Sequence, residues 1–131
     1  VSGRLGNGAV ASVYVSAIPW VGDGYRMEIY GREGTLVAVS QDTPQLRVVS
    51  LKGARAGDSG LQDLEVPAER VTAPVETPEN EPKNVGEMYV RFADAIRNGA
   101  TCEPDFNTAV SLHRLIDAVA TSSKEGRAVE L

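Results

Sequence analysis

The hydrophobic pattern changes its period once along the chain, and this change limits the fold more than any other feature. Up to about Val66, apolar and polar residues alternate in short runs, whereas from Asn84 onward apolar residues recur every three or four positions. Alternation is typical of strands, and the longer period is typical of amphipathic helices. Because strands precede helices and their connections are short, the sequence predicts an α+β fold: a mostly antiparallel, open-faced sheet with helices packed on one face.

The expected elements follow from these runs and from the turn residues between them. We expect a helix capped by Asn84, with Glu87 three residues later, that ends at Asn98-Gly99, and a second helix from Phe106 to about Ser123, capped by Asp105. Between sheet and helices, residues 67–82 contain four prolines and predict an extended surface crossing. The expected strands are residues 9–17, 25–30, 35–40, 45–51, 61–66 and 128–131.

Composition excludes several classes of function. The 131 residues carry a formal net charge of −5, which disfavours binding to nucleic acid phosphates. The single cysteine excludes an internal disulfide and a zinc site built from several thiolates. No apolar run reaches the roughly 20 residues of a membrane span, and the first residues lack the apolar region of a signal peptide. We therefore expect a single cytoplasmic domain, residues 1–131, with no nucleic acid or membrane partner.

Three features could carry chemistry, and for each of them the structural interpretation is favoured. Residues 3–8 (GRLGNG) are rich in glycine, but they lack the order and the strand–helix context of a dinucleotide loop, so we expect a turn. His113 and Asp117 are four residues apart on a helix, where they could form a general base or, more simply, a hydrogen bond. Cys102 has no cationic neighbour in sequence that would activate it. The sequence therefore predicts no catalytic, cofactor-binding or metal-binding residue in this chain.

Two features indicate binding instead. Trp20 lies in a turn rich in proline and glycine, where it could plug the core, or else form the wall of a ligand site or anchor an interface. If the strands pair as expected, Tyr14, Arg26, Tyr30 and Arg47 share the second face of the sheet. Arginine and tyrosine are enriched at protein interfaces. This face is therefore either an ordinary wet sheet face or a surface through which the domain associates with itself.

Three segments together resemble one family. Residues 25–36 (YRMEIYGREGTL) are similar to the strand–G-x-x-G–strand signature of the Gfo/Idh/MocA oxidoreductases (glucose–fructose oxidoreductase, inositol dehydrogenase and relatives), in their C-terminal domain. Residues 92–99 (FADAIRNG) resemble the end of its F-x-x-A-I-x-x-G helix. The closing helix and strand resemble the family at Pro104, Asp105, Ala109, Leu115, Asp117, Ala118, Ser122, Gly126, Arg127, Val129, Glu130 and Leu131.

The resemblance implies a function for the whole protein and a smaller role for this chain. Members carry an N-terminal Rossmann domain that binds NAD or NADP, an E-K-P lysine and a D-x-x-x-H histidine, and they move hydride to or from a sugar or polyol. None of these motifs occurs here, and the order of His113 and Asp117 is reversed. The resemblance therefore implies a C-terminal domain, inactive alone, that forms part of the substrate cleft against its own N-terminal domain and supports a homo-oligomer through its sheet. The alternative is a free-standing ligand- or protein-binding module without enzymatic activity.

Overall fold

The computed structural model describes residues 1–17 and 20–131, which form two units. One unit contains Val21–Ala100, and the other contains Val1–Trp20 together with Thr101–Leu131. The units are described separately below. The sheets are antiparallel and the helices come mainly after the strands, so the predicted α+β class is confirmed.

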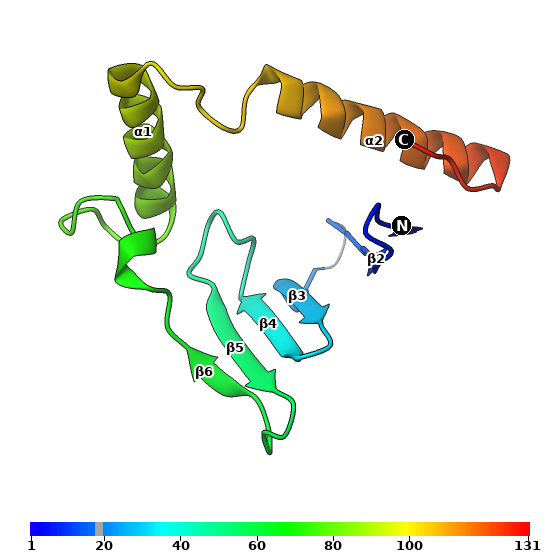
Figure 1. The fold of residues 1–131 in the computed structure, drawn as a ribbon, viewed down its shortest axis with the longest axis horizontal. Helices are drawn as coiled ribbons and strands as arrows, with labels where there is room; N and C mark the ends of the chain where they lie inside the picture. The colour runs from blue at the N-terminus through cyan, green and yellow to red at the C-terminus, as the bar shows by residue number, and fades with distance from the viewer. Residues whose placement is uncertain (18–19) are drawn as a thin grey trace. The chain divides into compact units, whose positions relative to one another are not determined.

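A four-stranded antiparallel sheet dominates the Val21–Ala100 unit (Figure 1). Its strands are β3 (Tyr25–Tyr30), β4 (Gly34–Ser40), β5 (Ser50–Arg55) and β6 (Gln62–Leu64), and they pair in sequence order. β3 and β4 form the hairpin expected from the alternating pattern, closed by a hydrogen bond from Gly31 N–H to the carbonyl of Gly34 (2.8 Å). The strands expected at residues 25–30 and 35–40 are therefore confirmed, and β6 lies within the expected range.

The strand expected at residues 45–51 is wrong, because a turn occupies most of that range. The amides of Leu46 and Arg47 both donate to the carbonyl of Thr43 (3.0 and 3.2 Å), and the carboxylate of Asp42 accepts from the Thr43 amide (2.8 Å). Such local hydrogen bonds compete with a sheet ladder, and Pro44 has no amide hydrogen to offer one. β5 therefore begins only at Ser50, and it includes residues 52–55, which were expected to form a loop.

The register of the sheet separates two faces. One face, here called the apolar face, carries Tyr25, Met27, Ile29, Leu36, Ala38, Leu51, Gly53 and Leu64. The opposite face, here called the mixed face, carries Arg26, Glu28, Tyr30, Thr35, Val37, Val39, Lys52 and Asp63. Val37 and Ala38 in the central strand β4 are buried, one on each face. The side-chain period of two along each strand produces this separation.

Gly24 holds the start of β3 against the end of β4. Its φ is +75°, a left-handed conformation that favours glycine. A Cβ at this position would lie 2.2 Å from the carbonyl oxygen of Ser40 and 2.6 Å from the carbonyl carbon of Gln41. Both the conformation and the close backbone approach therefore require glycine here.

The first helix, α1 (Glu81–Asn98), follows the proline-rich crossing, which contains a short 3-10 turn, η1 (Ala68–Arg70). α1 begins four residues earlier than expected, after Asn80, and Pro82 lies in its first turn. Its C-terminal Gly99 adopts the expected left-handed conformation. The predicted capping pair of Asn84 and Glu87 is wrong, because both side chains make contacts outside the helix.

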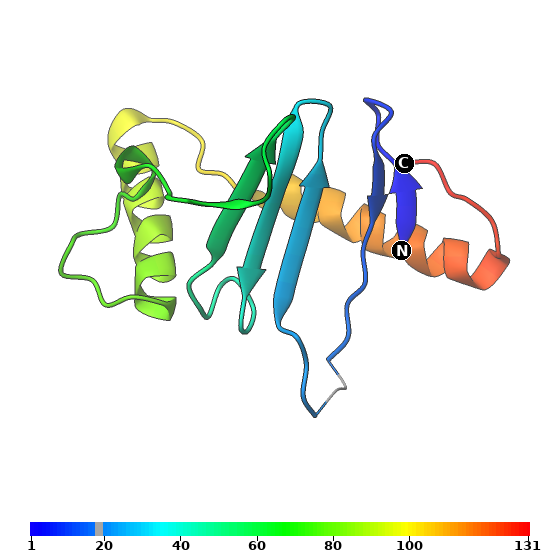
Figure 2. The same ribbon diagram turned by 90° about the horizontal axis from the view of Figure 1, so that it is seen from below.

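These contacts join α1 to the connecting segments of its unit. Asn84 Nδ2 donates to the carbonyls of Pro44 (3.3 Å) and Gln45 (2.9 Å), and the carboxylate of Glu87 accepts from the backbone of the crossing. In both views α1 stands apart from the four strands, to the left of the sheet (Figure 2). The expected packing of a helix on the sheet is therefore not formed by α1, because polar contacts with the connections hold it elsewhere.

The other unit contains a small hairpin, formed by β1 (Ser2–Arg4) and β2 (Val10–Ser12). The glycine-rich segment expected as a turn forms β1 and the turn that follows, in which Gly8 N–H donates to the carbonyl of Leu5 (2.8 Å). The strand expected at residues 9–17 stops at Ser12. The backbone bond that follows the pair joins Val13 N–H to the carbonyl of Val1 (2.7 Å).

The second helix, α2 (Phe106–Glu125), confirms the prediction closely. The carboxylate of Asp105 caps it by accepting from the amide of Thr108 (2.8 Å), and Gly126 ends it in the left-handed conformation. The strand expected at residues 128–131 is wrong. The Ser122 hydroxyl donates to the carbonyl of Arg127 (2.7 Å), which holds the end of the chain against the helix and away from a ladder.

Candidate functional surfaces

A polar network lies along β3 on the mixed face. Arg26 Nε donates to the Glu28 carboxylate (2.9 Å), and the Tyr30 hydroxyl donates to the other oxygen of the same carboxylate (2.8 Å). The Tyr30 hydroxyl, followed by Arg26, lowers the pKa of Glu28. The Glu28 carboxylate in turn raises the pKa of Tyr30. Arg26 and Tyr30, two of the residues expected at an interface, are therefore brought together by Glu28.

The neighbouring strands continue this pattern of paired charges. Lys52 on β5 forms an ion pair with Asp63 on β6 (3.2 Å), and the two residues lie opposite each other in the ladder. Tyr30 itself is largely exposed at the sheet edge. A face whose charges are mutually paired, with exposed tyrosine among them, suits a partly wet contact.

Tyr14 and Arg47 do not lie in strands of this sheet, so the strand positions predicted for them are wrong. Tyr14 follows β2 in the other unit, outside any strand, and is 90% exposed. Arg47 lies in the turn between β4 and β5, and its guanidinium is 3.7 Å from the carboxylate of Glu81 at the start of α1. Both placements were inferred from strands at residues 9–17 and 45–51 that do not extend over these positions.

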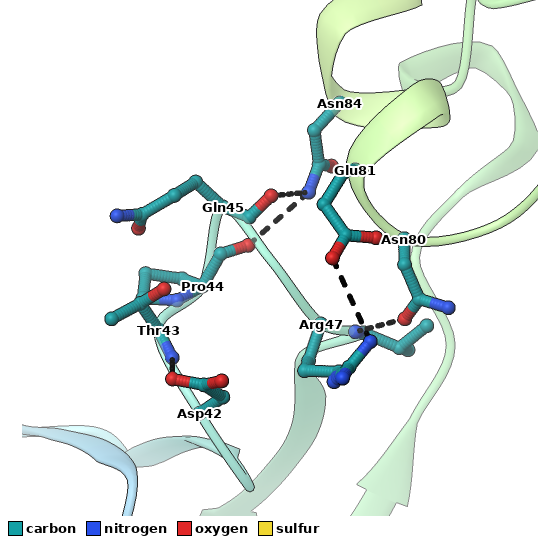
Figure 3. Close-up of polar contacts among 9 residues, drawn as sticks. Asp42, Thr43, Pro44, Gln45, Arg47, Asn80, Glu81 and Asn84 are labelled. Carbon is teal, nitrogen blue, oxygen red and sulfur yellow. Dashed lines mark hydrogen bonds and ion pairs between the residues drawn. The ribbon is translucent and has the colours of Figure 1, made fainter.

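Arg47 lines a polar hollow of about 490 Å³. Figure 3 shows Arg47 and Asn80, another of its lining residues, with their polar contacts. Asn80 shapes this hollow: it adopts a φ of 71°, which is unusual for a residue other than glycine, and its Oδ1 accepts from the amide of Val48 (3.2 Å). Within residues 1–17 and 20–131, the buried Ser40 hydroxyl in its wall has no hydrogen-bond partner. The lining residues are Asp23, Val39, Ser40, Gln41, Arg47, Val48, Ser50 and Asn80. The hollow therefore offers both hydrogen-bond donors and acceptors, which suits a small polar ligand.

The sequence did not indicate Asn80 as a site residue. The only signal was its place directly before Glu81-Pro82, where proline in the first turn marks the beginning of a helix. Its contact with Val48 joins residues 32 positions apart, which no local pattern reveals.

Glu87 fixes the proline-rich crossing to α1. Its carboxylate accepts from the amides of Thr72 (2.7 Å) and Ala73 (2.8 Å) and from the Thr72 hydroxyl. The amide of Ala73, followed by the hydroxyl of Thr72, lowers the pKa of Glu87. Ala73 is buried, and Gly86 leaves room for it, since a Cβ there would lie 3.4 Å from the Cβ of Ala73. The middle of the crossing, at Thr72 and Ala73, is therefore attached to α1.

The apolar face contains a second hollow, of about 590 Å³. Gly53 forms part of its floor, and a Cβ there would meet side-chain atoms of Leu64 at 2.7 Å and of Leu36 at 3.1 Å. Ile29 also lines the hollow, and Arg55 and Asp58 lie at the same end of the sheet. The apolar side chains around it are about half exposed.

The remaining candidate residues stay apart from these surfaces. The side chain of Trp20 is fully exposed, so it does not plug a core, while the neighbouring Ile18 and Pro19 lie outside the described residues. His113 and Asp117 are exposed on α2, and no hydrogen bond joins them in the described structure. Cys102 is a half-buried free thiol. Within residues 1–17 and 20–131, no three histidine, cysteine or acidic side chains gather in a way that could hold a metal ion.

The glycine-rich segment at residues 3–8 does not have the setting of a dinucleotide loop. The glycine-rich turn after β1 leads into an antiparallel strand, whereas a dinucleotide loop leads from a strand into the N-terminus of a helix. In addition, neither helix in the described part of the chain has the length and apolar character that a bilayer crossing demands.

Comparison with protein families accounts for this arrangement. The family model described as the oxidoreductase family, C-terminal alpha/beta domain (Gfo/Idh/MocA), matches residues 1–131. The chain belongs to this family. The resemblance to the Gfo/Idh/MocA C-terminal domain inferred from residues 25–36 and 92–99 is thus confirmed. No curated protein and no solved structure shows a significant match to the chain.

Proposed function

We propose that this chain is the C-terminal domain of an NAD(P)-dependent oxidoreductase that acts on a sugar or polyol, and that it contributes assembly and substrate contacts rather than hydride chemistry. The match of the family model to residues 1–131 carries this proposal. It is supported by the glycine turn between antiparallel strands, which offers no cradle for a dinucleotide. NAD or NADP would then bind to an N-terminal domain.

The polar hollow beside Arg47 supports a role on the substrate side. It combines a guanidinium, an amide, hydroxyls and the carboxylate of Asp23. Because Arg47 is already near Glu81, the hollow does not carry an unbalanced positive charge. Hydrogen-bond donors and acceptors without excess charge suit the hydroxyl groups of a neutral polyol. The exposed ring of Trp20 remains a second candidate for a substrate contact.

The mixed face supports a role in assembly. Its charges are paired within the network of Arg26, Glu28 and Tyr30 and between Lys52 and Asp63, so another surface can approach without burying an unpaired charge. A two-fold axis would place this face against its own copy, which is the commonest closed arrangement. A specific contact of this kind should bury more than about 1,000 Å² in total.

Light scattering tests the assembly proposal. Tyr30→Glu introduces a negative charge beside Glu28 on the mixed face, so a dimer at micromolar concentration should shift toward monomer. Tyr14→Glu is the matched control, because Tyr14 is equally aromatic and exposed but lies outside the four-stranded sheet. A monomeric unmodified chain, or equal effects of the two variants, would contradict association through this face.

Fluorescence titration with NADH and NADPH tests whether the dinucleotide binds to an N-terminal domain and not to this chain. We expect no saturable change with this chain, and saturable binding once a nucleotide-binding N-terminal domain is present. Saturable micromolar binding to this chain alone would show that it is not a domain of the proposed kind.

A further inference from the structure

The side chain of Arg47 has hydrogen-bond donors that the protein itself does not use. A guanidinium carries five N–H groups and no acceptor. The carboxylate of Glu81 lies 3.7 Å from it, which is close enough for an ion pair but too long for a hydrogen bond. Among the described residues, no group accepts a hydrogen bond from this guanidinium, and 52% of the side chain is exposed. The donors therefore remain available to a ligand in the polar hollow that Arg47 lines.

The backbone that carries Arg47 is nevertheless held from two directions. The amide of Val48, the next residue, donates to Oδ1 of Asn80 (3.2 Å). Asn84 Nδ2 donates to the carbonyl of Gln45, two residues before Arg47 (2.9 Å; Figure 3). A donor whose backbone is already fixed loses less conformational entropy when a ligand binds.

Two carboxylates set the charge around this guanidinium. Glu81 is its ion-pair partner, and Asp23 lines the same hollow. Asp23 forms no ion pair in the part of the chain that the structure describes. The two carboxylates outnumber the single guanidinium, so an anionic ligand would meet net repulsion. The hollow therefore favours an uncharged ligand, even though an arginine lines it.

An uncharged ligand that matches these groups carries adjacent hydroxyls. The planar guanidinium presents parallel pairs of N–H groups. Two hydroxyl oxygens on neighbouring carbon atoms lie close enough together to accept from one such pair, whereas oxygens on more distant carbons lie further apart. Each hydroxyl keeps its own proton, which it can donate to a carboxylate such as that of Asp23. The volume of the hollow, about 490 Å³, is in the usual range for small-molecule sites.

We propose that Arg47 is the specificity-determining residue of the polar hollow, where its guanidinium donates to two adjacent hydroxyl groups of an uncharged polyol. Glu81 balances the charge of the guanidinium without occupying its donors, and Asp23 accepts from a ligand hydroxyl. Together the two carboxylates exclude the acidic and phosphorylated forms of the same sugars. This assignment rests on the proposed function, because it takes the hollow as a site on the substrate side. All of these residues belong to the Val21–Ala100 unit.

Three small ligands test the assignment on the unmodified, isotope-labelled chain. The method is titration by nuclear magnetic resonance, with the amide of Val48 as the reporter beside Arg47. Sorbitol is an uncharged chain of adjacent hydroxyls, gluconate is its counterpart with a carboxylate at one end, and pentaerythritol is an uncharged polyol without adjacent hydroxyls. We expect saturable shifts with sorbitol, and binding of gluconate and pentaerythritol that is weaker by several-fold or more.

Either of two results with these ligands would overturn the proposal. Gluconate that binds as tightly as sorbitol, or more tightly, would show that Arg47 forms an anion site. Pentaerythritol that binds as tightly as sorbitol would show that adjacent hydroxyls are not recognised.

Substitutions separate the paired donors of Arg47 from its charge. Arg47→Lys keeps the positive charge beside Glu81 but lacks the paired N–H groups, so sorbitol binding should weaken by about tenfold. Arg97→Lys, on an exposed side chain at the end of α1, is the matched control and should bind sorbitol like the unmodified chain. Glu81→Gln removes one of the excluding carboxylates, so it should raise the affinity for gluconate relative to sorbitol several-fold. An unchanged ratio would overturn the exclusion by charge.

The outcomes distinguish this assignment from the proposed function. Sorbitol binding that is unchanged in Arg47→Lys would overturn the role of Arg47 and leave the hollow as a polyol site. Absence of saturable sorbitol binding to the unmodified chain would overturn both the role of Arg47 and the substrate role of the hollow. Should Arg47→Lys fail to fold by circular dichroism, the comparison of the three ligands on the unmodified chain still decides.

Discussion

The two faces of the four-stranded sheet share one backbone, but their side chains differ in whether they are stable in contact with water. On the mixed face, Glu28 satisfies Arg26 and Tyr30, and Lys52 pairs with Asp63, so the face is stable in water. On the apolar face, Leu36 and its neighbours are half exposed and gain nothing from water. The comparison shows that the mixed face is stable without a partner, whereas the apolar face contributes to stability only when other groups cover it.

The largest expected effect comes from breaking the hairpin on which both faces depend. Gly24→Ala forces a left-handed φ on alanine and places its Cβ against the backbone at Ser40. We expect a loss of about 3 kcal/mol or more in the free energy of unfolding, measured by denaturant titration. Gly60→Ala is the control, because its Cβ would meet nothing within 4 Å, and its effect should stay within about 0.5 kcal/mol. Equal effects would show that the close approach at Gly24 is not maintained in solution.

A glutamate placed on one face or the other should destabilise the protein to different degrees. Leu36→Glu removes apolar surface from the half-exposed apolar face, and it should cost about 1 kcal/mol or more, since full burial of leucine contributes roughly twice that amount. Thr35→Glu puts the same charge on the adjacent position of the mixed face, where it should change stability by less than about 0.5 kcal/mol. Thermal unfolding of both variants measures the difference, and a larger loss in Thr35→Glu would invert the comparison.

The smallest expected effect concerns the pH response of the mixed face. The pKa of Glu28 is lowered in the folded chain, so its contribution to stability is present above its ordinary pKa and is lost as the pH falls through the lowered value. The pKa of Tyr30 is raised, so its contribution is present below its ordinary pKa and is lost as the pH rises through the raised value. The network is therefore intact between these limits.

Glu28→Gln tests this coupling. Because the Glu28 carboxylate is the main cause of the raised pKa of Tyr30, the variant should return that pKa toward its ordinary value. Ultraviolet titration of the phenol groups measures the change, and Tyr30→Phe identifies which part of the curve belongs to Tyr30. An unchanged Tyr30 pKa in Glu28→Gln would show that the hydrogen bond does not form in solution.

Features that depend on neighbouring residues were predictable from the sequence. Asp105 and Gly126 mark the two ends of α2, because a capping carboxylate and a left-handed glycine act within a few residues of the helix end. The alternation in β3 and β4 separates an apolar face from a mixed one, because successive side chains of a strand point to opposite sides. The resemblance at residues 25–36 identified the family for the same reason, since its signature is local.

Features that depend on distant residues were decided by the tertiary structure. Asn84 and Glu87 have the spacing of a capping pair, but their side chains bond to the backbone of Gln45 and Ala73, so the helix begins earlier. Arg47 belongs to a turn beside Glu81 instead of the mixed face, because hydrogen bonds to Thr43 outcompete a strand at that position. A residue pattern reports which conformations are locally favourable, whereas the partner that satisfies a polar side chain 30 or 40 residues away exists only after the chain has folded.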